Sequence, residues 1–219
     1  MKRVFTLITL LIPFSSFAQN QFGISINPGI SMPTKSFTAG RTTFDAGIAP
    51  SLSAGLWYKH QVGGFQFGTR IMFNQIESKD KLSTIFIENG RQTGISNTRF
   101  ELHMLYFSIP ICFGWQKENY GITAGFRSSL LLSSSATELG HYYYNGNYSK
   151  IENEYDILEI HNYDYGPEIS FTYSLNDQFE FDFTAYHGLV NISTQVPSPW
   201  IWRIKQATIG IKYLFYSKP

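Results

Sequence analysis

The chain has 219 residues, and its 17 basic and 16 acidic side chains leave a formal net charge of +1, which gives no electrostatic basis for binding nucleic acid. Cys112 is the single cysteine, so an intrachain disulfide is excluded. Aromatic residues make up 17% of the chain. Charged residues make up only 15%, below the roughly 25% of charged residues in soluble domains. Because the hydrophobic content of 43% is ordinary, apolar and polar residues must be interleaved.

The N-terminus has the three parts of a secretory signal peptide. The cations Lys2-Arg3 precede an apolar run at 4–14, and Ser16-Phe17-Ala18 supplies the small residues before a cleavage site. The apolar run is too short to span a bilayer as a helix. We therefore expect residues 1–18 to be removed and residues 19–219 to form one domain with a formal charge of −1.

Eight segments of this domain alternate with the period of two that is typical of β-strands with two unlike faces. In the third, Phe65, Phe67, Ile71 and Phe73 alternate with polar residues and glycine. The signal is weak in one strand but strong when it is repeated. The eight segments are approximately 21–31, 47–59, 65–77, 99–115, 120–133, 163–175, 179–191 and 205–216.

The connections between these segments are alternately short and long. This order predicts an eight-stranded antiparallel up-and-down transmembrane β-barrel with tight periplasmic turns, long extracellular loops and periplasmic N- and C-termini. The alternative is a soluble lipocalin-like barrel with its apolar face inside and its charges outside. The short connections are 60–64, 116–119 and 176–178, and the long ones are 32–46, 78–98, 134–162 and 192–204.

The charged face of each strand should point into the barrel, because Lys or Arg facing lipid at the midplane costs about 2–4 kcal/mol. An eight-stranded barrel is just wide enough for side chains to fill its lumen. Heights counted from the short turns predict two ion pairs, Arg127–Glu168 and Asp182–Lys212. A structural plug is the first interpretation, and a regulated proton or ion path is the alternative. The predicted lumen network is Arg70, Arg127, Glu168, Glu180, Asp182 and Lys212, with Lys59.

Aromatic residues gather at both ends of the predicted strands, as they do in the girdles that mark the two membrane interfaces. They are Tyr58, Trp115, Tyr120, Tyr173, Tyr213 and Phe215 at the short turns, and Tyr163, Tyr165, Tyr186, Trp200 and Trp202 at the long loops. We expect the loop that holds Trp200 and Trp202 to rest on the membrane or to cap the barrel.

Four short motifs resemble the PorT-like outer-membrane β-barrel family of Gram-negative bacteria. They are Tyr106-Phe107-Ser108-Ile109-Pro110-Ile111, Gly121-Ile122-Thr123-Ala124-Gly125-Phe126, Tyr165-Gly166 and Ala185-Tyr186-His187-Gly188-Leu189-Val190-Asn191. The resemblance spans nearly the whole chain after residue 18 and brings no catalytic residues with it. It implies an outer-membrane barrel, and its founding member implies an accessory role in protein secretion.

The third long connection is the candidate partner-binding loop. Tyrosine combines a large contact area with adaptable hydrogen bonding, so a protein, glycan or lipopolysaccharide contact at this loop is one interpretation, beside the outer-membrane lipid and lipopolysaccharide that surround the barrel. A solvated loop without a partner is the plainer interpretation. The candidate residues are Tyr142, Tyr143, Tyr144 and Tyr148.

The sequence predicts no catalytic, cofactor-binding or metal-binding residues. His187 with Ser193 is the one pairing that could serve a small lipid hydrolase or acyltransferase. The preferred hypothesis is therefore a non-enzymatic outer-membrane barrel, serving envelope structure or surface docking. The alternatives are the secretion accessory and the lipid enzyme.

Overall fold

The computed structural model describes residues 18–32, 34–36, 42–89, 91–156, 160–192 and 201–217, and every regular element in them is a β-strand. No helix in these residues is long and apolar enough to cross a membrane. The predicted signal peptide lies, except for Ala18, outside the described residues, and its removal stays a prediction.

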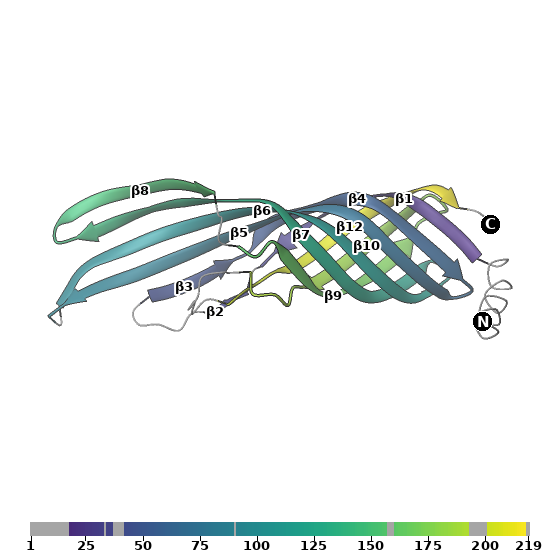
Figure 1. Ribbon diagram of the computed structural model, residues 1–219, viewed down its shortest axis with the longest axis horizontal. Helices are drawn as coiled ribbons and strands as arrows, with labels where there is room; N and C mark the ends of the chain where they lie inside the picture. Colours follow the sequence, from purple (N-terminus) through teal and green to yellow (C-terminus); the bar gives the residue numbers. More distant parts are fainter. Residues whose placement is uncertain are drawn as a thin grey trace, which may run out of the picture.

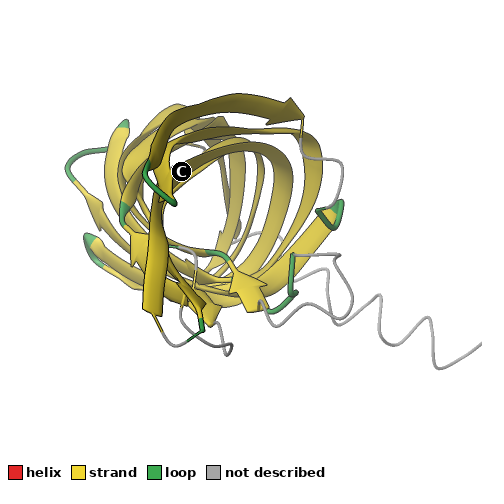
Figure 2. Ribbon diagram, turned by 90° about the vertical axis from the view of Figure 1, so that its left-hand side faces the viewer, coloured by secondary structure: helices red, strands yellow, loops and turns green. Residues whose placement is uncertain are grey.

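Eight strands close into an antiparallel ring, which confirms the predicted fold (Figures 1 and 2). Each pairs with the neighbour before and after it, and β1 with β12 completes the circle. The eight are β1 (Ala18–Ser31), β4 (Ala49–Val62), β5 (Phe65–Glu88), β6 (Arg91–Lys117), β7 (Tyr120–Tyr144), β9 (Tyr163–Ser174), β10 (Phe179–His187) and β12 (Lys205–Ser217).

The two faces of the wall have the orientation predicted from charge. Along β9 and β10 buried and exposed residues alternate with period two. Ile209, on the outward face, is 64% exposed, whereas Arg127, on the inward face, is 2% exposed. The lipocalin-like alternative required the reverse orientation and is wrong. Apolar side chains therefore cover the outside of the ring, where acyl chains can solvate them.

Short turns close one end of the barrel, where β1 begins and β12 ends (Figure 1). Gly63 makes the β4–β5 turn with a φ of 58°, a left-handed conformation that suits glycine. In the β9–β10 turn the side-chain oxygen of Asn176 accepts hydrogen bonds from the backbone N–H groups of Gln178 and Phe179, each at 2.9 Å. These turns fix the register of the strands that follow them.

The opposite end differs from the prediction, because residues 78–88, 91–98, 134–144 and 147–156 are strands instead of loops. β5, β6 and β7 continue far beyond the ring and project from it as a sheet (Figure 1). Two shorter strands widen this sheet: β3 (Thr42–Gly47) pairs with β5, and β8 (Asn147–Asp156) pairs with β7. We call the part of β5 to β8 beyond the ring, with β3, the projecting sheet.

The other two long connections hold one small additional sheet. In it, β2 (Thr34–Ser36) pairs antiparallel with β11 (Ile201–Arg203). β11 directly precedes β12, so this pair lies at the end of the ring from which the projecting sheet extends. It brings two connections that are far apart in sequence together at that end of the lumen.

Candidate functional site

The middle of the lumen holds a buried ionic layer centred on Glu168. One carboxylate oxygen of Glu168 lies 2.5 Å from Arg127 Nη2 and accepts from Arg127 Nε at 2.6 Å, and the other contacts Arg70. Arg70 also donates to Asp182 at 2.9 Å, and Lys212 lies 3.0 Å from the second oxygen of Asp182. Both pairs expected from the turn heights are within ion-pair distance. Arg70 links them across the lumen, which was not expected.

A second pair lies nearer the short turns. Lys59 Nζ is 2.5 Å from Glu180 and also donates to Gln116 at 3.0 Å. The ring of Trp57 lies between Lys59 and Lys212, with 5.7 Å from each ammonium to the ring centroid. Cations gain from such contacts with an aromatic face. Every member of the predicted lumen network is thus buried and has an ionic partner.

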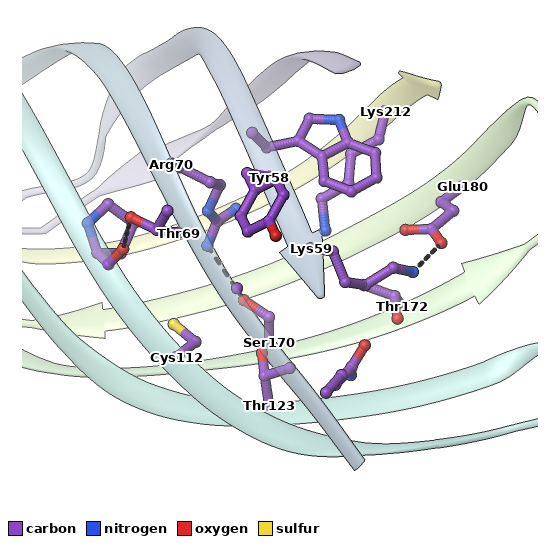
Figure 3. A pocket seen from close by; sticks show the side chains of 14 residues that line it. Tyr58, Lys59, Thr69, Arg70, Cys112, Thr123, Ser170, Thr172, Glu180 and Lys212 are labelled. Carbon is purple, nitrogen blue, oxygen red and sulfur yellow. Dashed lines mark hydrogen bonds and ion pairs between the residues drawn. The ribbon is translucent and has the colours of Figure 1, made fainter. Parts of the chain in front are cut away.

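A small cavity separates these two groups of charges (Figure 3). Lys59, Arg70 and Lys212 line it together with hydroxyl groups and Cys112, whose Sγ lies 3.8 Å from Glu168. Its volume is about 50 Å³, above the roughly 10–15 Å³ that a cavity needs to hold a single water molecule. A space of this size is far too small to form a wide pore.

An apolar cap closes the lumen at the projecting end, and the sequence analysis did not predict it. Leu102, Met104 and Tyr106 face inward from β6 and pack with side chains from the connections that cross the barrel mouth. The sequence signal was present, because the inward positions of β6 are apolar here. The cap consists of Ile76, Leu102, Met104, Tyr106, Ala136, Ile160, Tyr186, Ile192 and Ile204, with Leu131 and Trp202 packed against it.

Two members of the predicted outer aromatic girdle belong to this cap. Tyr186 is 4% exposed and faces the lumen, where the guanidinium of Arg127 lies 4.2 Å from its ring centroid. The loop that holds Trp202 was expected either to rest on the membrane or to cap the barrel. Trp202 packs against the cap, so the second expectation is correct for this residue. Trp200 lies outside the described residues. The assignment of Tyr186 and Trp202 to the girdle was wrong because it considered only how far along the strands they lie. It did not consider whether their side chains face lipid or the lumen.

Asp164 holds the end of β10 against the cap. Its carboxylate accepts a hydrogen bond from the Tyr186 hydroxyl at 2.8 Å and one from the Val190 backbone N–H at 3.3 Å. Gly188 fits beside it because it has no side chain: a Cβ there would lie 2.3 Å from a carboxylate oxygen. This anchor gives a physical reason for glycine in the sequence Tyr186-His187-Gly188.

The four candidate tyrosines lie on strands and divide between the two faces of the projecting sheet. Tyr142 and Tyr144 stack on each other at 5.9 Å and contact Phe86 on the face continuous with the lumen. Tyr143 and Tyr148 are register partners on the outer face. They are 46% and 67% exposed. The expectation of one solvated loop at these residues is therefore wrong, and two separate aromatic surfaces replace it.

An exposed hydrogen bond and an exposed ion pair accompany these tyrosines. The Tyr144 hydroxyl donates to Glu88, and this hydrogen bond raises the pKa of Tyr144. Lys150 lies 2.6 Å from Glu152 on the outer face. Their hydrogen bond raises the pKa of Lys150 and lowers the pKa of Glu152, so both are charged at neutral pH.

The structure does not test the pairing considered for catalysis, because one of its two residues lies outside the described part of the chain. His187 ends β10 beside its register partner Lys205, and Ser193 lies outside the described residues. No group of three His, Cys, Asp or Glu side chains in residues that the structure describes could hold a metal ion.

A model of the family described as outer membrane protein beta-barrel domain matches residues 17–194, which is most of the chain. The chain belongs to this family. It is accordingly an outer-membrane β-barrel protein, and the projecting sheet extends from its transmembrane ring. The PorT-like resemblance is narrower than this family and stays a prediction. No curated protein matches the sequence.

Three solved outer-membrane proteins are similar to this one in structure. Neisserial surface protein A has 11% identity and a TM-score of 0.41, over 88% of this chain and 97% of that one. Ail of Yersinia pestis has 8% identity and a TM-score of 0.40, over 90% and 99%. The outer membrane protease OmpT of Escherichia coli has 10% identity and a TM-score of 0.39, over 90% and 96%. Similarity at this level says nothing about ligand or activity.

Proposed function

We propose that this protein is a closed, non-enzymatic outer-membrane barrel whose projecting sheet is a docking surface outside the cell. The lumen supports this proposal because side chains fill it at two levels. The ionic layer around Glu168 fills one level, and the apolar cap around Tyr106 fills the other. A filled lumen favours a role that lies outside the ring. In this orientation the short turns and the N- and C-termini of the chain face the periplasm, and the projecting sheet faces away from the cell.

The projecting sheet carries the proposal. It holds three exposed or half-exposed aromatic pairs: Phe86 with Tyr142, Tyr142 with Tyr144, and His141 with Tyr148. Aromatic side chains that protrude without apolar cover are typical of binding surfaces. A rigid sheet also presents them with little loss of conformational entropy on binding. The ligand class is a protein or a glycan.

Photo-crosslinking in living cells tests the docking role. A benzophenone amino acid at Tyr143 or Tyr144 should give an adduct of discrete mass, because these positions lie on the two faces of the projecting sheet. The matched control is Asp177 in the short β9–β10 turn, where no such adduct should form. Absence of adducts at both tyrosines, in cells that assemble the barrel normally, would refute docking through this sheet.

Conductance tests the closed lumen independently. In planar bilayers the purified protein should show no steady current on the scale of a large porin. The secretion role that the PorT-like resemblance implies makes a different prediction, namely that a knockout accumulates exported proteins in the periplasm. No contact described above favours that role over docking.

A further inference from the structure

The outer face of the projecting sheet carries an open groove of about 760 Å³. It runs across β5, β6 and β7 towards β8, following one register row from Ser83 through Asn97 and His141 to Lys150. Ser83 and Asn97 are short, and the Ser83 hydroxyl donates to the side-chain oxygen of Asn97 at 2.8 Å. The middle of the groove is therefore low and lined by hydroxyl and amide groups.

One side of the groove is cationic. Lys81 and Arg99 lie directly opposite each other in the β5–β6 register, and Lys150 lies at the β8 end. None of the described residues that line the groove is acidic. Carboxylates lie next to it instead. Arg99 contacts Glu101 at 2.7 Å, and Lys150 contacts Glu152 at 2.6 Å. In the backbone register, position 45 of β3 lies opposite Lys81.

The facing of Lys81 and Arg99 is unfavourable for the sheet by itself. Like charges directly opposite each other on neighbouring strands are destabilising. The ion pair between Arg99 and Glu101 is exposed and contributes little to stability. Exposed cations of this kind can therefore exchange a carboxylate for a more highly charged anion. A local arrangement that disfavours the fold is expected where a surface has a function.

The end of the groove at β8 is aromatic. The rings of His141 and Tyr148 stack with their centroids 6.0 Å apart and their planes at 25°. Tyr148 is 67% exposed, so much of its side chain is open to solvent despite this stacking. An aromatic plane beside hydroxyl and amide groups suits a sugar, which presents C–H groups on one face and hydroxyl groups at its edge.

The height of the groove above the membrane favours a sugar over a lipid headgroup as the ligand. Lys81 lies eight residues beyond Phe73, the last large apolar residue before it on the outer face of β5; Ile85, 40% exposed on the same face, lies four residues farther from the membrane than Lys81. At ~3.3 Å per residue and a tilt of ~45°, this places the groove roughly 19 Å above the apolar band. The headgroup region is only about 5–7 Å thick on each side. The groove is thus level with saccharide attached to the lipid and not with the membrane surface.

We propose that this groove binds a phosphorylated sugar of the lipopolysaccharide in the same outer leaflet. Lys81 and Arg99 contact the phosphate, Ser83 and Asn97 contact sugar hydroxyl groups, and Tyr148 packs against the ring. This rests on the proposed docking function and names one ligand for the outer face. The stacked pair Tyr142–Tyr144, on the opposite face, is not part of this site.

Binding of a defined saccharide to the whole protein in nanodiscs tests the proposal. The probe is deacylated lipopolysaccharide core oligosaccharide carrying its phosphates, and the comparison probe is the same oligosaccharide after dephosphorylation. The variant is Lys81→Gln with Arg99→Gln. The matched control is Lys79→Gln, which removes a cation one register row away, outside the groove.

The wild type should bind the phosphorylated oligosaccharide at least about 10-fold more tightly than either the dephosphorylated probe or the double variant does, since charge-assisted hydrogen bonds are lost in both cases. The Lys79→Gln control should stay within about two-fold of wild type. Equal affinity for both probes, equal loss in the control, or no binding by wild type would overturn the proposal. If crosslinked adducts still form at Tyr143 or Tyr144, the docking function survives that result. If they also fail to form, both proposals fall.

Discussion

Replacing Glu168 by Gln should destabilise the barrel by about 3–5 kcal/mol, the range measured when one partner of a buried ion pair is removed. The Glu168 side chain is fully buried and contacts two guanidinium groups, those of Arg70 and Arg127. Glutamine has nearly the same shape but no charge. Arg70 then keeps Asp182, whereas Arg127 loses its direct carboxylate contact and keeps Gln206, the face of Tyr186 and the nearby Asp164.

Urea unfolding in lipid vesicles, followed by tryptophan fluorescence, measures this loss. The matched control is Glu152→Gln, which removes a carboxylate from an exposed pair with Lys150 and should leave the urea midpoint unchanged. Adding Arg127→Met to Glu168→Gln should recover at least about 1 kcal/mol, because the second change removes the unpaired cation. A cost below about 1 kcal/mol for Glu168→Gln would show that water reaches the ionic layer and would refute a desolvated plug.

Three further predictions concern the closed lumen and its cap. Cys112 is buried in the lumen, so maleimide should label it only after unfolding, and labelling of the folded barrel would contradict the inward placement. Gly188→Ala should destabilise the barrel by about 1–3 kcal/mol, because its Cβ would meet the anchored Asp164 carboxylate; unaltered urea unfolding would count against this anchor. Ile204→Ala should cost about 2–4 kcal/mol through a cavity in the cap yet leave bilayer conductance unchanged, since the ionic layer persists; a new large current would show that the cap alone closes the lumen.

The ring itself could be predicted from the sequence because its two faces meet different solvents. Along β10, Phe181 and Phe183 face lipid while Glu180 and Asp182 face the lumen, so the side-chain chemistry has the period of the backbone. The same contrast gives the height of each charge above a short turn. Those heights were sufficient to pair Arg127 with Glu168 and Asp182 with Lys212.

The contacts of Arg70 could not be predicted from the heights of the charged residues above the short turns. Arg70 lies on β5, and its partners Glu168 and Asp182 lie on β9 and β10, which are not neighbours of β5 in the ring. Contacts across a lumen depend on the curvature and shear of the closed barrel, which neither composition nor period contains. The sequence therefore identified the members of the ionic layer but not how they are connected.

The projecting sheet was missed for the opposite reason, because both of its faces meet water. Beyond the membrane, β5 alternates Lys81, Ser83 and Ile85 on one face with Leu82, Thr84 and Phe86 on the other, so polarity no longer follows the backbone period. What remains is a preference for strand-forming residues, as in Ile85-Phe86-Ile87, which is weaker than solvent contrast and depends on context. The part of this wall that is hardest to recognise as strand is therefore the part on which neither lipid nor the lumen imposes a requirement. Its side chains are free to vary in ways that favour binding of a ligand. The unfavourable facing of Lys81 and Arg99 occurs there, where nothing in the packing of the barrel calls for it.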